Sequence, residues 1–392
     1  MSHTTAEPKT HTPPIESRLP RVGTTIFTVM SALATEHGAV NLGQGFPDFD
    51  CDPALIEAVA KAMRQGLNQY PPMAGVPALR EAVAAKIESL YGHRYDPTSE
   101  ITITAGATQA ILSAILAVVH AGDEVIVLDP CYDSYEPNIL LAGAVAVHVP
   151  LTAGTFRPDF ERISRSMTPS TRAIVINSPH NPSATVWTMA EMEQLARLLQ
   201  PTDVIVISDE VYEHMVFDGA AHQSVSRFTE LAERSIVISS FGKTYHVTGW
   251  KVGYAAAPAA VTAEFRKVHQ FNVFTVNTPM QHGLAAYMAD PVHHLTLPAF
   301  YQRKRDLFRA GLERTRFRML PSQGTYFQCV DYSAVSDLPE EDFCRWLTVE
   351  KGVAAIPLAA FYADGFDQRI ARFCFAKKDE TLALALDRLA QL

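Results

Sequence analysis

A lysine directly after an apolar, strand-like run is the residue best suited to covalent chemistry in this sequence. Lys243 follows the run Ser235–Ser240, and a second cation, Lys251, comes eight residues later. A lysine amine can hold an aldehyde cofactor as a Schiff base. The hydroxyl of Ser240 and the charge of Lys251 could then hold the phosphate of that cofactor. A surface lysine in a loop is the alternative interpretation, so the chemistry depends on partners elsewhere in the chain.

The same segment excludes one common phosphate site. Gly242, Lys243 and Thr244 match the end of a P-loop, which also needs a glycine five residues before Gly242. Val237 stands there, inside the strand-like run. We therefore do not expect a nucleotide-binding loop.

Polar residues also end two other apolar runs. Asp209 follows Val204–Ser208, where a buried acid needs a positive or hydrogen-bonding partner. A protonated pyridine nitrogen would be such a partner, although a helix N-cap aspartate would look the same. Asn181 lies in Asn177–Pro182, whose two asparagines and two prolines would also form a tight turn without any ligand.

Three further signals are weak individually. Arg372 lies in a predicted strand with apolar flanks, and a buried arginine usually has a carboxylate partner, from the protein or from a ligand. Thr104–Gln109 joins a strand to a helix, where backbone N–H groups favour a phosphate. Many ordinary turns share that pattern. Tyr132 could stack on a ring or simply pack in the core.

The elements that must position these residues follow an alternating pattern. Helical patterns separate most of the strand-like runs, which is typical of a doubly wound α/β domain with a mostly parallel sheet. In such sheets, ligands lie beyond the carboxyl ends of the strands, where Asn181, Asp209 and Lys243 fall. The predicted strands are Ile101–Thr104, Glu124–Leu128, Val145–Val149, Ala173–Asn177, Val204–Ser208, Ser235–Ser240 and Val252–Ala256.

The two ends of the chain predict a second, smaller α+β domain. A long helix, Pro298–Arg316, precedes predicted strands Gly324–Asp331 and Ile370–Phe375. Predicted helices are Glu340–Lys351 and Asp379–Leu392. We expect a flexible arm at 1–20, a small domain from 21–50 and 291–392, and a large domain at 51–290.

Composition excludes several functional classes. The formal net charge of the 392 residues is -9 and no basic block occurs, which argues against nucleic-acid binding. No apolar run has the length of a membrane span, and the N-terminus lacks the apolar core of a secretory signal. The five scattered cysteines indicate reduced thiols in a cytoplasmic protein. We expect no metal site and find no G-x-S-x-G elbow.

The order and spacing of these residues resemble a known family. Together with NLGQGFPDF, LNQY, DEVY, GKTYHVTGWKVGY and IARFCFAK, they resemble the class I, fold-type I, pyridoxal-phosphate-dependent aminotransferases over essentially the whole chain. The resemblance is closest to the subgroup of bacterial methionine aminotransferases and kynurenine/glutamine aminotransferases. It implies a seven-stranded large domain, pyridoxal 5′-phosphate, and a cytoplasmic homodimer with shared active sites.

The resemblance also implies roles for the residues at the cofactor. Lys243 resembles the lysine that holds pyridoxal phosphate, and Asp209 resembles the partner of its pyridine nitrogen. Asn181 and Tyr212 match residues that bind the ring oxygen, and Tyr212 is expected to be catalytic with Lys243 and Asp209. Tyr132 matches the residue that stacks on the ring. The phosphate ligands would be Ala107, Thr108, Ser240, Lys251 and, from the partner subunit, Tyr70.

The implied substrates are an amino acid and a 2-oxo acid, used in a ping-pong reaction. Gly45, Asn181 and Arg372 match the group that binds the substrate carboxylate. Phe27 and, from the other subunit, Phe274 match positions that line the side-chain pocket. No second arginine is evident for a distal carboxylate, which favours uncharged side chains, with methionine first.

The sequence departs from the family pattern at two points. Ala184 stands where N-P-x-G often has glycine, and Lys251 stands where many relatives have arginine. Two alternatives to transamination remain open. One is a C–S β-lyase that uses the same site. The other is a cofactor-sensing regulator, which would need a DNA-binding segment that the short N-terminal arm does not provide.

Overall fold

The computed structural model describes residues 15–392 and contains a seven-stranded sheet in the order β2-β8-β7-β6-β5-β3-β4. β3 to β7 run parallel where they pair, and β8 runs antiparallel to both of its neighbours. The strands are β2 (Ile101–Thr104), β3 (Glu124–Asp129), β4 (Val145–Pro150), β5 (Thr171–Asn177), β6 (Ile205–Asp209), β7 (Ser235–Ser240) and β8 (Gly253–Ala256). The predicted mostly parallel, doubly wound sheet is confirmed.

Apolar residues on both faces of the strands explain why helices cover both faces. Side chains alternate along a strand, so Val125 and Val127 join one core while Ile126 and Leu128 join the other. The first core contains residues of α4 (Gly106–Val118), α5 (Tyr135–Leu141) and α10 (Ala259–Asn272). The second contains residues of α2 (Pro53–Arg64), α3 (Pro77–Tyr91), α6 (Phe160–Ser166), α7 (Met189–Leu199), α8 (Thr229–Ala232), α9 (Phe241–Thr244) and α11 (Thr278–Met288).

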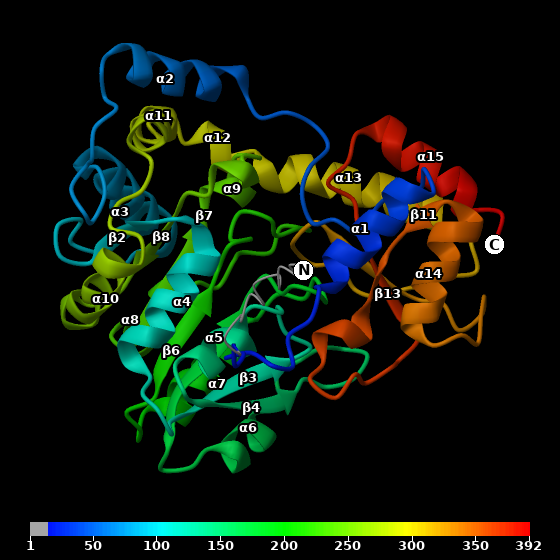
Figure 1. The fold of residues 1–392 in the computed structure, drawn as a ribbon, viewed down its shortest axis with the longest axis horizontal. Helices are drawn as coiled ribbons and strands as arrows, with labels where there is room; N and C mark the ends of the chain where they lie inside the picture. The colour runs from blue at the N-terminus through cyan, green and yellow to red at the C-terminus, as the bar shows by residue number, and fades with distance from the viewer. Residues whose placement is uncertain (1–14) are drawn as a thin grey trace, which may run out of the picture.

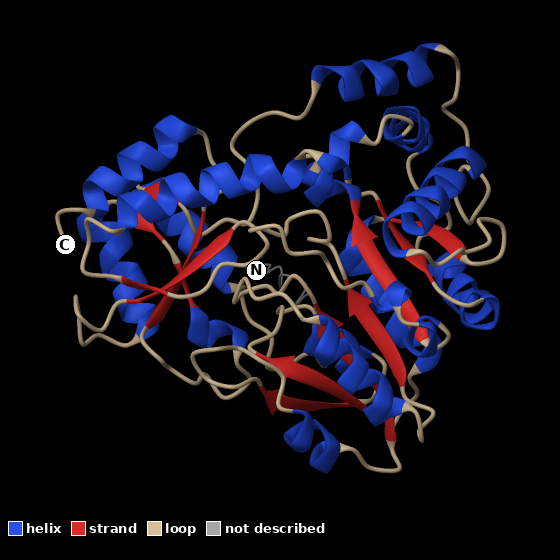
Figure 2. Cartoon of the chain, turned by 180° about the vertical axis from the view of Figure 1, so that it is seen from behind, coloured by secondary structure: helices blue, strands red, loops and turns tan. Residues whose placement is uncertain are grey.

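A smaller antiparallel sheet lies apart from the large one, as Figure 2 shows. Its order is β12 (Ile356–Pro357), β13 (Ile370–Cys374), β10 (Phe327–Asp331) and β9 (Arg318–Met319). Around it lie α1 (Ile26–Glu36), α14 (Glu340–Lys351) and α15 (Asp379–Leu389), with α12 (Val292–Leu295) and α13 (Leu297–Leu312) leading from the large sheet (Figure 1).

The two ends of the chain meet in this smaller region. β1 (Val40–Asn41) pairs in parallel with β11 (Val353–Ala354), and α1 contacts α14. The proposed domain boundaries at residues 51 and 290 stay a prediction. Residues 1–14 of the predicted arm lie outside the described part of the chain. Within that part, no helix combines the length and apolar character needed to cross a membrane.

Several predicted ends are wrong for local reasons. The strand predicted from Gly324 begins at Phe327, because Thr325 has a left-handed backbone with φ of 64°. The helix predicted to Arg316 ends at Leu312, where tight turns replace helical hydrogen bonds. The helix predicted to Leu392 ends at Leu389. The start of α7 is well defined, because Thr188 and Glu191 form a capping box there.

Candidate active site

A cavity of about 280 Å³ lies at the carboxyl ends of the parallel strands. Its walls come from the large sheet, the smaller sheet and the N-terminal segment, which agrees with the expected place for a ligand in this fold. Twelve of the fourteen predicted site residues line it: Phe27, Gly45, Ala107, Thr108, Tyr132, Asn181, Asp209, Tyr212, Ser240, Lys243, Lys251 and Arg372.

Lys243 presents its amine to this cavity from the short helix α9, directly after β7. The Nζ atom donates to the carbonyl oxygen of Gly45 at 3.0 Å and to the hydroxyl of Tyr326 at 2.9 Å. Burial lowers the pKa of the amine to about 8, because water no longer stabilises the charged form. The amine therefore loses its proton more easily near neutral pH than an ordinary lysine does, and only the neutral amine acts as a nucleophile or proton acceptor.

Asp209 ends β6 and is buried at the bottom of the cavity. The hydroxyl of Tyr135 donates to Oδ2 at 2.7 Å, and the backbone N–H of Val211 donates to Oδ1 at 3.2 Å. Burial raises the pKa of the carboxyl to about 6, while these two hydrogen bonds oppose that rise. No cation among residues 15–392 forms an ion pair with this carboxylate. The site therefore offers a negative charge to a protonated ring nitrogen.

Asn177 joins the ends of the two neighbouring strands β5 and β6. Its Nδ2 donates to the carbonyl oxygen of Asp209 at 2.8 Å, and its Oδ1 accepts the backbone N–H of Asn181 at 2.7 Å. These bonds fix the position of Asn181 relative to Asp209. The Asn177–Pro182 turn is thus both a tight turn and a wall of the cavity.

Arg372 reaches the cavity from β13 of the smaller sheet and is only 1% exposed. Its Nη1 donates to Oδ1 of Asn181 at 2.6 Å, and its Nη2 donates to the carbonyl of Gly43 at 3.1 Å. The guanidinium lies 3.9 Å from the ring centroid of Phe327. Nε is buried without a hydrogen-bond partner, and no carboxylate among the described residues pairs with the charge. A ligand carboxylate would supply that partner.

The opposite wall of the cavity is suited to an anion. Gly106 opens α4, a helix of 13 residues, and has a φ of 77° that favours glycine. Ala107 and Thr108 follow in the first turn, where free N–H groups and the helix dipole favour negative charge. Ser240 and Lys251 line the same cavity. A Cβ atom at Gly106 would stand 3.4 Å from the Lys251 amine, so glycine keeps this approach open.

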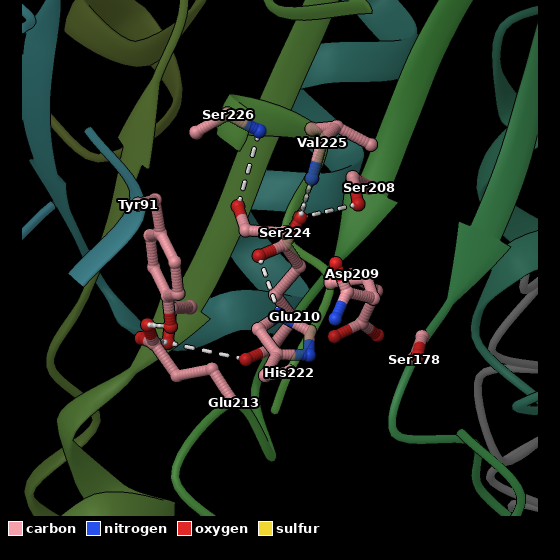
Figure 3. A network of polar contacts seen from close by, with 12 residues as sticks. Tyr91, Ser178, Ser208, Asp209, Glu210, Glu213, His222, Ser224, Val225 and Ser226 are labelled. Carbon is pink, nitrogen blue, oxygen red and sulfur yellow. Dashed lines mark hydrogen bonds and ion pairs between the residues drawn. The ribbon is translucent and has the colours of Figure 1, made fainter. Parts of the chain in front are cut away.

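A buried polar network surrounds Glu210 and Glu213, which follow Asp209 in the chain (Figure 3). Glu213 pairs with Lys86 at 2.6 Å and also accepts hydrogen bonds from the hydroxyl groups of Tyr91, Ser239 and Tyr254. Glu210 accepts from Ser208 and the N–H of Val225 and contacts His222. The Glu213 side chain is thus a buried group whose oxygens all have partners, and the network makes the position of the nearby Asp209 rigid.

Two predicted site residues lie outside the cavity. Tyr70 and Phe274 pack edge to face with ring centroids 5.2 Å apart, and they are 81% and 46% exposed. Both had been assigned to the partner subunit. Two other residues were not predicted at all: Tyr135, which binds Asp209, and Tyr326, which binds Lys243. No sequence signal distinguishes these two tyrosines from core aromatic residues.

The chain is similar to known proteins of one family. The model of the family "Aminotransferase class I and II" matches residues 37–389. A methionine aminotransferase of Escherichia coli K12 is 53% identical over 378 residues, which cover 96% of this chain and 98% of that protein. Human kynurenine–oxoglutarate transaminase 1 is 35% identical, covering 91% of this chain and 93% of that protein.

Solved structures agree with these relatives. The structure of YbdL from Escherichia coli, described as having a methionine aminotransferase function, superposes with a TM-score of 0.95 and 53% identity. The superposition covers 97% of this chain and 100% of the YbdL chain. An N-succinyldiaminopimelate aminotransferase from Mycobacterium tuberculosis superposes with a TM-score of 0.92 and 42% identity, covering 96% of this chain and 100% of that chain.

Proposed function

Because this chain belongs to the class I and II aminotransferase family and is an aminotransferase, we propose that it uses pyridoxal 5′-phosphate. The proposed reaction moves the α-amino group of an uncharged or aromatic L-amino acid, with methionine favoured, to a 2-oxo acid. One observation carries the proposal. A lysine amine of lowered pKa, a buried carboxylate and an arginine without a carboxylate partner share one cavity in the described chain.

The residues of the cavity fit the chemical groups of this cofactor. Asp209 would hold the ring nitrogen, Asn181 and Tyr212 the ring oxygen, and Tyr132 the face of the ring. The phosphate would lie at the start of α4, with Ala107, Thr108, Ser240 and Lys251 around it. When bound, the protonated ring supplies an electron sink for the negative charge that forms at the substrate Cα.

The protein then contributes a movable proton and a fixed orientation. Lys243 takes the proton from the substrate Cα, for which an amine with a pKa of about 8 is well matched to neutral pH. Asp209 keeps the proton on the ring nitrogen. Arg372 binds the substrate carboxylate and so sets the direction of the Cα–H bond. The second substrate, a 2-oxo acid, uses the same residues in reverse, which gives ping-pong kinetics.

The charges around the cavity support an uncharged substrate side chain. Among the described residues that line it, the cations are Lys243, Lys251 and Arg372, and each has a role above. The remaining lining includes Phe27 and Phe46, which suit a thioether or an aromatic ring. The similarity to an Escherichia coli methionine aminotransferase makes methionine the first substrate to test.

We also propose a cytoplasmic homodimer with shared active sites. Tyr70 and Phe274 are exposed side by side, and a second copy could bring the tyrosine to the cofactor phosphate and the phenylalanine to the substrate side chain. The five cysteines are all free thiols, which fits a reducing compartment.

A panel of amino donors with one fixed 2-oxo acid acceptor tests the proposed function. We expect methionine and aromatic amino acids to give the highest kcat/KM, and aspartate to give the lowest. A preference for a dicarboxylic donor would refute the assignment of an uncharged side chain. Pyruvate and ammonia released from cysteine conjugates without an acceptor would instead indicate a C–S β-lyase. Lys243→Ala should abolish transamination, and retained turnover would refute the role of Lys243.

A further inference from the structure

Three side chains that can bind a metal meet at one edge of the large sheet. Asp129 ends β3, Cys131 follows it, and His148 lies in the edge strand β4. In the parallel register, His148 stands beside Val127. Val127 and Asp129 face the same side because side chains alternate along a strand. Strand pairing therefore brings His148 to Asp129 across 19 residues of sequence, which no local motif reveals.

The three ligand atoms already lie within 4.8 Å of one another. Nδ1 of His148 is 2.9 and 3.0 Å from the two carboxylate oxygens of Asp129. Asp129 and Cys131 are buried, whereas the His148 side chain is 21% exposed and leaves a route from solvent. A thiolate, an imidazole and a carboxylate are the ligand types that zinc takes in proteins.

The second nitrogen of His148 supports the same assignment. Nε2 is buried without a hydrogen-bond partner and lies 3.9 Å from the carboxylate of Glu136. Histidines that bind a metal through one nitrogen commonly donate the other N–H to a carboxylate. A cation on Nδ1 would leave the proton on Nε2, facing Glu136.

The charge around the cluster also favours a cation. Two acids face the ring nitrogens of His148: Asp129 at 2.9 Å and Glu136 at 3.9 Å. Apart from His148, the one described cation that forms an ion pair with these acids is the exposed Arg21, which pairs with Glu136. A divalent ion would relieve the repulsion among these acids and displace the thiol proton.

We propose that Asp129, Cys131 and His148 form a binding site for zinc or a similarly thiophilic divalent cation, separate from the cavity that holds Lys243. Water would complete a four-coordinate shell. This proposal does not depend on the proposed substrate or cofactor.

Zinc binding to the purified enzyme, loaded with its cofactor and freed of metal, tests the site. Equilibrium dialysis in a thiol-free buffer should give one tightly bound zinc per chain. Cys131→Ser and His148→Ala should each weaken that binding by at least about tenfold, because even supporting residues of metal sites have effects of that size. His120→Ala is the matched control, since the exposed His120 lies 3.7 Å from Asp123 without a cysteine in the cluster.

X-ray absorption on the wild-type protein provides a readout that needs no variant. It should show one sulfur neighbour at about 2.3 Å from zinc, with nitrogen or oxygen neighbours at about 2.0–2.2 Å. Zinc with only nitrogen and oxygen neighbours would refute the proposal. So would the absence of tightly bound zinc, or binding that Cys131→Ser and His148→Ala leave unchanged.

Discussion

Replacing Tyr135 by phenylalanine tests how the chain keeps Asp209 ionised. The Tyr135 hydroxyl is buried and donates to Oδ2 of Asp209 at 2.7 Å, while burial alone raises the pKa of this carboxyl. The hydroxyl stabilises the charged form, so its loss should raise the pKa further. Activity that needs an ionised Asp209 should then be lost at a higher pH than in the wild type.

The size of the change follows from the hydrogen bond. A hydrogen bond to a charged group contributes about 1.5–3 kcal/mol. At 1.36 kcal/mol for each pH unit, this corresponds to an upward change of about 1–2 pH units in the pKa of Asp209. In the wild-type protein, the Asp209 carboxyl has a pKa of about 6. The Tyr135→Phe enzyme should therefore lose activity on the acid side at a midpoint about 1–2 pH units above that of the wild type.

The assay is the pH dependence of kcat, together with that of the cofactor dissociation constant. With cofactor bound, the carboxylate and the ring nitrogen titrate as a pair, so the difference between the two enzymes is the informative quantity. Tyr95→Phe is the matched control, because its buried hydroxyl contacts Ser226 at 3.3 Å and not Asp209. An equal midpoint in Tyr135→Phe and wild type would refute this reasoning, as would an equal change in Tyr95→Phe.

Arg372→Lys should raise KM for the amino donor roughly 10- to 150-fold, since a charge-assisted hydrogen bond contributes about 1.5–3 kcal/mol; unchanged saturation kinetics would argue against the carboxylate role. Lys86→Met should lower the free energy of unfolding by about 3–5 kcal/mol, because Glu213 would keep a buried charge without its cation. Lys267→Met is the control, because Lys267 pairs with Glu264 at the surface. In the same denaturant titration it should lower the free energy of unfolding by only about a few tenths of a kcal/mol. Tyr70→Phe should raise the cofactor dissociation constant roughly 10- to 150-fold, because a hydrogen bond to the charged phosphate contributes about 1.5–3 kcal/mol; an unchanged constant would refute contact between the Tyr70 hydroxyl and the phosphate.

Much of the fold could be predicted because each strand carries its own signal. Each of the seven predicted strands of the large sheet appears within about two residues of its expected ends, since apolar runs bounded by turns are a local property. The α11 helix was not predicted, although it lies in the second core with Gly283 close against Val59. Its small and polar residues give a weak period, so packing against α2 rather than propensity defines it.

The residues of the site also divide into those that the sequence predicts and those that only the structure reveals. Lys243, Asp209 and Asn181 could be singled out because polar residues at strand ends are unusual, and their spacing matched a family. Tyr135 and Tyr326 could not be predicted as site residues, because tertiary packing decides which groups their hydroxyls contact. In a sequence, a tyrosine in a helix or before a strand normally indicates only a core residue.

The hydrogen bond from Arg372 to the carbonyl of Gly43 joins residues 329 positions apart in the chain. A contact of this sequence separation forms late, because a long stretch of chain must be ordered before it can close. During synthesis, the substrate carboxylate site cannot exist until β13 has left the ribosome. Substrate binding is therefore a stringent test of complete folding, and a chain truncated before Arg372 could retain much of the large sheet without becoming an active enzyme.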